Sequence, residues 1–210
     1  MTGARLVTAT FVVLLVAQLL IGVVFGSIQT GTTVLATDAG QAGIAGLVHA
    51  SLGVGSVIAG LAVAALPARF GYASRVLVAA LGLALLSLPL LVTDTIPRLF
   101  LVVLVLGFVV APYMISVFML GERAAPASRV GAAMTLLAGA TGLGYAVGSA
   151  AAGRLADVHG HTGAFAVTVT AAASAALLAG LSQPLLRGIG APDRSTPADV
   201  EQKDTAPAAV

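Results

Sequence analysis

The stretch TATFVVLLVAQLLIGVVFGSIQTGTTVLA, residues 8–36, contains no Asp, Glu, Lys or Arg, and it decides the fold class. A helix needs roughly 20 consecutive apolar residues to cross the hydrocarbon core of a bilayer. In lipid the backbone polar groups must be satisfied within the segment, which favours a helix. The stretch also lacks the alternating pattern of a membrane β-strand. It therefore predicts a transmembrane helix.

Five further apolar stretches follow, separated by short segments that hold most of the charge. They cover residues 42–66, 76–93, 97–120, 130–153 and 163–185. A helix of a soluble bundle would have a charged outer face, and these stretches have none. We therefore predict an all-α membrane protein whose residues 1–185 form one domain of six transmembrane helices. Residues 186–210 are rich in Pro, Ala and charge, and we expect a disordered cytoplasmic tail there.

The composition agrees with a membrane environment and excludes several functions. Charged residues make up 9% of the chain, against roughly 25% in soluble domains. The chain has no Cys, and His49 has no partner ligand in the membrane stretches, so we expect no metal and no cofactor. The net charge of +2 gives no reason to expect nucleic acid as a partner. No phosphate-binding Gly-rich loop with a Lys is present, which excludes ATP-driven transport within this chain.

The basic residues indicate the orientation, because Lys and Arg are enriched in cytoplasmic loops. With six spans both termini lie on one side. Placing the termini in the cytoplasm leaves only Arg98 and Arg154 outside. The basic residues inside are then Arg5, Arg69, Arg75, Arg123, Arg129, Arg187, Arg194 and Lys203. We predict a multi-pass protein of the plasma (inner) membrane with both termini cytoplasmic.

Small and polar residues recur at steps of three or four along the predicted helices, as residues on one helix face do. In the first helix they are Gln18, Gly22, Gly26, Gln29 and Thr33. In the second they are Gly46, His49, Gly53, Ser56 and Gly60. In the fifth they are Thr135, Gly139, Gly142, Ala146, Ser149 and Gly153. The fourth has Tyr113 and Ser116 next to Pro112, which should kink it. This pattern favours inward-facing helices one, two, four and five and lipid-facing helices three and six.

Two explanations remain open for these stripes. Small residues allow membrane helices to pack closely. Alternatively, the stripes line a substrate pathway, because polar groups in a membrane are costly unless they face protein or water. The candidate pathway residues are Gln29, Thr33, His49, Ser56, Tyr113 and Ser116.

Two segments carry a resemblance to a known family. Residues 111–160, APYMISVFMLGERAAPASRVGAAMTLLAGATGLGYAVGSAAAGRLADVHG, run from a Pro-containing helix through a Glu-Arg and Pro loop and a Gly-rich helix to a Gly-x-x-x-Asp-x-x-Gly turn. The other segment is GVVFGSIQTGTTVLA, residues 22–36. Over about residues 5–185 the chain resembles the C-terminal half of a major facilitator superfamily (MFS) transporter.

The resemblance implies gating residues in the loops. The family's loop motif Gly-x-x-x-Asp-Arg-x-Gly-Arg-Arg survives only in part at 64–75, where Ala64 replaces the first Gly and Ala68 replaces the Asp. Ala68 has no charge, so it cannot supply the role that the resemblance would give the Asp in gating. The candidate gating residues are Arg69, Gly71, Arg75, Glu122, Arg123, Gly153, Asp157 and Gly160.

The resemblance also implies a fold and a function. The fold would be one six-helix half of an MFS protein, built of two inverted three-helix repeats. The function would be secondary active transport, in the efflux direction, of a small organic molecule such as a drug, sugar or metabolite. A complete MFS transporter has two such halves. We therefore expect a fragment or truncated reading frame, or a half that works with a separate N-terminal six-helix half or by self-association, with the lipid bilayer as a further partner.

Two other classes of protein are alternatives to a transporter. One is a membrane subunit without transport activity. The other is an intramembrane enzyme such as a rhomboid-like serine protease, which needs a Gly-x-Ser-Gly turn and a later His. Here Val57 follows Ser56, and His49 precedes it. We therefore expect that the chain is not an enzyme.

Overall fold

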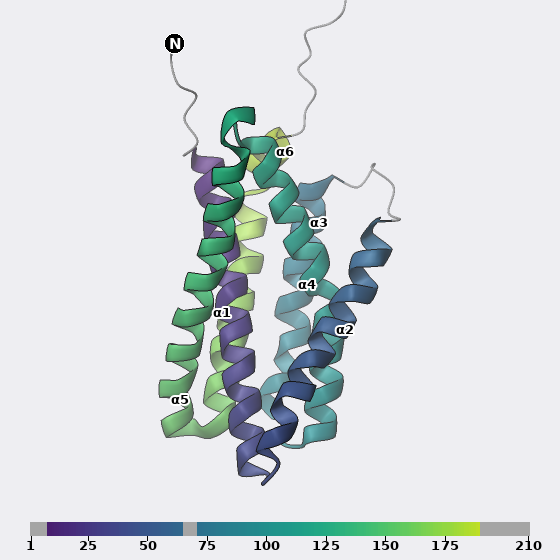
Figure 1. Ribbon diagram of the computed structural model, residues 1–210, viewed down its shortest axis with the longest axis vertical. Coiled ribbons are helices and arrows are strands. Elements are labelled where there is room, and N and C mark those ends of the chain that lie inside the picture. Colours follow the sequence, from purple (N-terminus) through teal and green to yellow (C-terminus); the bar gives the residue numbers. More distant parts are fainter. Residues whose placement is uncertain (1–7, 65–70, 190–210) are drawn as a thin grey trace, which may run out of the picture.

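The computed structural model describes residues 8–64 and 71–189, which form a bundle of helices (Figure 1). The helices are α1 (Ala9–Asp38), α2 (Ala45–Ala64), α3 (Tyr72–Ser87), α4 (Ile96–Ala124), α5 (Val130–Leu181) and the short α6 (Gln183–Gly188). Short 3-10 helices, Ala42–Ile44, Leu88–Val92 and Ala127–Arg129, lie at the start of α2, the end of α3 and the start of α5. The described residues contain no strand, which confirms the predicted all-α class.

Five of these helices are long and apolar enough to cross a membrane, as expected for an integral membrane protein. Residues 186–188, which the sequence assigns to the tail, belong instead to α6. Leu186 is buried there, and Arg187 lies in the last turn. The remainder of the predicted tail, residues 190–210, lies outside the described residues.

The helix α5 reverses its direction at Gly160. This residue has φ 62° and ψ −157°, a conformation that favours glycine. Its two arms, residues 130–159 and 161–181, run side by side (Figure 1). Close to the turn, Gly163 packs against the backbone of Leu155. The reversal lies between the stretches that the sequence predicts as the fifth and sixth helices.

The chain turns alternately at the two ends of the bundle (Figure 1). One end holds the start of α1, the start of α3, the α4–α5 link and α6, and the other holds the α1–α2 link, the α3–α4 link and the turn at Gly160. By these positions the first end has Arg75, Arg123, Arg129 and Arg187. We call it the arginine-rich end. At the opposite end, the basic residues among those described are Arg98 and Arg154.

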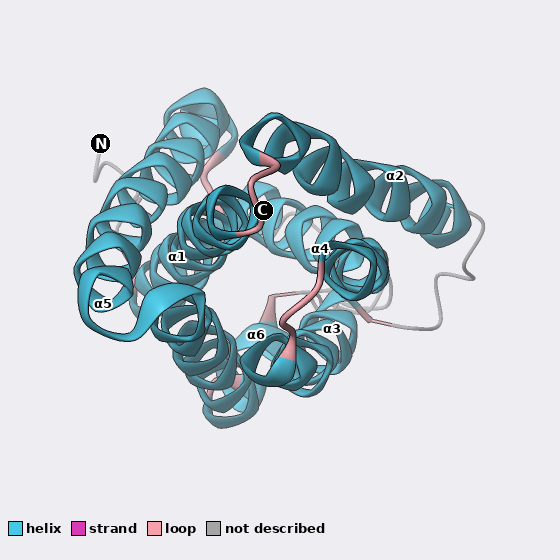
Figure 2. Cartoon of the chain, turned by 90° about the horizontal axis from the view of Figure 1, so that it is seen from below, coloured by secondary structure: helices cyan, strands magenta, loops and turns pink. Residues whose placement is uncertain are grey.

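The helix α1 lies in the middle of the bundle, where it packs mainly on the two arms of α5, whereas α2 packs mainly on α4 and lies at the edge (Figure 2). The second arm of α5, which the sequence predicts as a lipid-facing helix, has a buried side as well. Phe165 and Thr168, in the second arm of α5, are fully buried. The reason is that this arm fills the space between α1 and α3.

Candidate functional site

The first arm of α5 and α1 approach each other backbone to backbone through glycines. A Cβ added at Gly22 would lie 2.8 Å from the Tyr145 backbone nitrogen, and one added at Gly148 would lie 2.6 Å from the Val23 Cα. Gly26 and Gly144 contact the facing backbone in the same way. Gly22 and Gly26 belong to the stripe of the first helix, and their contacts are those of the close-packing explanation; Gly144 and Gly148, four residues apart, supply the facing contacts on α5.

A second glycine contact joins α2 and α4. Gly55 and Gly107 face each other, and a Cβ added at Gly55 would lie 3.1 Å from the Gly107 Cα. The Ser56 hydroxyl donates a hydrogen bond of 3.1 Å to the Gly107 carbonyl oxygen at this crossing. Ser56, a predicted pathway residue, therefore has a structural role in the helix contact.

Other stripe residues have no neighbour within the described chain. Gly46 and Gly53 of α2, and Gly139 and Gly142 of α5, have open space where a Cβ would project. Both helices also have a second exposed side that is aliphatic. It is formed by Leu47, Val54, Ile58 and Leu61 in α2 and by Leu136, Leu143 and Val147 in α5. Each helix thus exposes one small or polar side and one side typical of lipid contact.

A polar pair lies on the small side of α5. The Tyr145 hydroxyl donates a hydrogen bond of 2.8 Å to Gln29 Oε1 of α1, and both side chains are exposed. Thr33, one turn further along α1, is also exposed and donates to the Gln29 backbone oxygen. We call the surface formed by Gln29, Thr33, Gly142, Tyr145 and Ser149 the Gln29 face. Tyr145 is absent from the stripe predicted for the fifth helix, although its spacing of three from Gly142 and four from Ser149 places it there.

The structure places Tyr113 and Ser116 away from the Gln29 face. Tyr113 is fully buried, and its hydroxyl donates a hydrogen bond of 3.0 Å to the Ala17 carbonyl oxygen. Ser116 is also fully buried and donates to the Pro112 carbonyl oxygen at 2.7 Å. A Ser hydroxyl that donates to a carbonyl of its own helix needs no partner from another helix. Both side chains are enclosed by the packing of this chain itself.

A buried polar contact connects α1 to the first arm of α5. Gln18 is fully buried, and Thr141 Oγ1 lies 3.3 Å from Gln18 Oε1 and 3.2 Å from the Leu137 carbonyl oxygen. Gln18 Nε2 has no hydrogen-bond partner among the described residues. Turning the amide over would let Nε2 donate to Thr141 while the hydroxyl donates to Leu137. Because that orientation satisfies one donor more, we favour it.

His49 of α2 is only partly buried, and its Nδ1 has no partner in the part of the chain that the structure describes. Within those residues, no three His, Cys, Asp or Glu side chains are close enough together to hold a metal ion. The candidate pathway residues thus divide into an exposed group of Gln29 and Thr33, a partly buried group of His49 and Ser56, and the two enclosed residues of α4.

At the arginine-rich end, an aromatic ring joins two of the predicted gating residues. The Arg123 guanidinium lies 4.6 Å from the centroid of the Tyr72 ring, and that of Arg75 lies 5.3 Å from it. Such cation–π contacts connect the end of α4 to the start of α3. Glu122 is exposed and forms no ion pair within the described residues. Gly71 immediately precedes α3, and Arg69 lies outside the described residues.

The predicted outer turn is only partly a turn. Gly153 lies within the helical first arm with open space around it, Asp157 is exposed near its end, and Gly160 alone reverses the chain. At this same end, Arg98 forms an exposed ion pair of 4.0 Å with Asp94. Exposed pairs of this kind contribute little to stability.

Comparison with known proteins gives no matching family model, and neither the curated proteins nor the solved structures provide a significant match.

Proposed function

We propose that this chain is one six-helix half of an MFS-type secondary transporter in the plasma membrane, and that a small organic molecule moves along the Gln29 face in the efflux direction. The observation that carries the proposal is the exposed Tyr145–Gln29 hydrogen bond on α1 and α5. Exposed polar groups in a membrane helix are costly unless they face protein or water. A pathway between this chain and a second six-helix unit would supply that environment.

The two-sided exposure of α2 and α5 supports the same proposal. The aliphatic sides of these helices suit lipid, whereas Gly46, Gly53, Gly139 and Gly142 provide room for an approaching helix or for a solute. These helices lie on either side of α1 (Figure 2). A second half, separate or a copy of this chain, would therefore cover α1 and meet the small sides of α2 and α5.

A water-soluble thiol reagent tests the pathway directly, because the chain has no natural cysteine. We expect Gly142→Cys and Gly53→Cys to react at least about tenfold faster than their neighbours Leu143→Cys and Val54→Cys, since thiols react as solvated thiolates. The neighbours are matched controls because both lie on the aliphatic sides. Equal rates within each pair, in correctly inserted protein, would contradict the proposal. They would show that water reaches the small sides of α2 and α5 no better than their aliphatic sides.

The six-span topology with cytoplasmic termini is part of this proposal. In this proposal the two arms of α5, which meet at Gly160, are separate crossings, and the arginine-rich end is cytoplasmic by the positive-inside rule. We expect Ala127→Cys to be labelled by an impermeant reagent only from the cytoplasm and His159→Cys only from outside. Both residues are exposed at opposite ends of the first arm. Labelling of both from one side would contradict the topology.

A further inference from the structure

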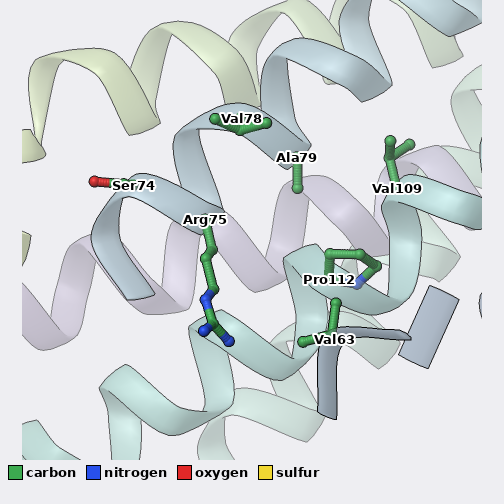
Figure 3. Close-up of a pocket in the computed structure, with 7 residues that line it drawn as sticks. All are labelled: Val63, Ser74, Arg75, Val78, Ala79, Val109 and Pro112. Atoms are coloured by element: carbon green, nitrogen blue, oxygen red, sulfur yellow. The ribbon is translucent and has the colours of Figure 1, made fainter. Parts of the chain in front are cut away.

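A groove opens between the ends of α2 and α3 and the middle of α4 (Figure 3), and none of its lining residues belongs to the Gln29 face. Its volume is about 370 Å³, and it is lined by Val63, Arg75, Val78, Ala79, Val109 and Pro112. We call it the α2–α3–α4 groove. It exists because α2 and α4 touch at the glycine crossing of Gly55 and Gly107 and then diverge toward the arginine-rich end (Figure 1).

The groove lies on the part of the surface that suits lipid. Val78 forms part of its wall and is 69% exposed, and the next exposed residues along α3 are Leu81 and Leu85. On the other side, Ile58 and Leu61 of α2 are exposed. An aliphatic surface therefore continues from the groove on both helices, as expected for contact with acyl chains.

Arg75 is the charged residue among those that line the groove. Arg75 lies in the first turn of α3, and its side chain extends toward the level of Val63 and Pro112 (Figure 3). Its guanidinium and that of Arg123 both lie within 5.3 Å of the centre of the Tyr72 ring. A guanidinium has five donors, so it can hold a phosphate while keeping other contacts.

We infer that the α2–α3–α4 groove binds an anionic phospholipid, with an acyl chain in the groove and the phosphate on Arg75. The groove is almost wholly apolar and opens on the aliphatic surface, so a hydrocarbon chain from the surrounding bilayer is the natural occupant. The arginine-rich end places the cation at the headgroup level, where basic residues attract anionic lipids. The inference requires a membrane but does not depend on transport.

Native mass spectrometry of the purified full chain, offered phosphatidylglycerol or phosphatidylcholine with identical acyl chains, tests this inference. We expect wild type to retain one phosphatidylglycerol with a preference of about fivefold over phosphatidylcholine. Arg75→Gln should abolish the preference but still retain lipid, because the groove remains. Ala79→Leu should reduce retention of both lipids by filling the groove. Arg187→Gln, which removes an exposed cation at the same end, should behave like wild type.

Three results would overturn the inference. The first is equal retention of the two lipids by wild type, and the second is an unchanged preference in Arg75→Gln. The third is displacement of bound lipid by glycerol phosphate, which would show that the headgroup alone is recognised. Circular dichroism of each variant checks that the helical content is intact. If Ala79→Leu loses helix, Val78→Ser, at an exposed wall position, replaces it, and lipid retention should fall there too.

Discussion

Gly144→Leu is expected to prevent α1 and α5 from packing together. A Cβ at this position would lie 3.0 Å from the Leu19 Cα and closer still to the Leu19 carbonyl oxygen. These are backbone atoms, which cannot move aside as a side chain can. Forcing extra volume into a tight contact costs about 1–3 kcal/mol and occasionally more. We expect the upper part of that range or complete loss of the folded bundle, because the two long helices would have to separate.

The measurement is thermal unfolding of the purified chain in detergent, followed by circular dichroism and by size-exclusion chromatography. Gly142→Leu is the matched control, since it makes the same change two residues earlier at a position with open space. It should unfold close to the wild-type temperature. If both variants unfold alike, the backbone contact between α1 and α5 does not hold the bundle together as the structure indicates.

The sequence predicted the helices well because lipid imposes a simple requirement on each of them. A run of apolar residues of membrane length has to form a helix by itself, and the helices begin and end close to the predicted stretches. Among the described residues, five helices rather than six have the length of a membrane span, because α5 is one helical run divided only at Gly160. The reversal depends on Gly160 alone, which has a positive φ. In the sequence, nothing distinguishes Gly160 from the many other glycines.

The site was less predictable, because a stripe of small residues does not show whether it faces another helix, lipid or water. Gly22 is a helix contact, whereas Gly53 and Gly142 have open space, although all three recur in the stripes at steps of three or four. The difference depends on which helices are neighbours. Thr168 illustrates the same limit: in the same arm Thr170 and Ser174 donate to the backbone of their own helix, and the residue type alone would suggest the same for Thr168. Instead it lies 2.8 Å from the Ser27 hydroxyl of α1.

Tyr145→Phe is expected to lower transport while leaving the fold intact. The change removes the hydroxyl that donates to Gln29 Oε1 and leaves the ring in place. A hydrogen bond of this kind contributes about 0.5–1.5 kcal/mol, so a solute bound at the Gln29 face should be transported roughly two- to tenfold more slowly. Gln29→Leu should have the same effect, because it removes the acceptor of the same bond. Uptake of a panel of small organic molecules into proteoliposomes, with the partner half present, measures this.

Tyr113→Phe is the matched control, because it removes the same atom from a fully buried tyrosine. That hydroxyl donates to the Ala17 carbonyl oxygen, so its loss should lower the free energy of unfolding by about 1 kcal/mol. Transport per folded molecule should stay unchanged, since the side chain lies within the packing of the chain. The two tyrosines thus separate stability from transport. If Tyr113→Phe slows transport and Tyr145→Phe does not, the pathway runs past α4, as the sequence alone suggested, and the Gln29 face is not its lining.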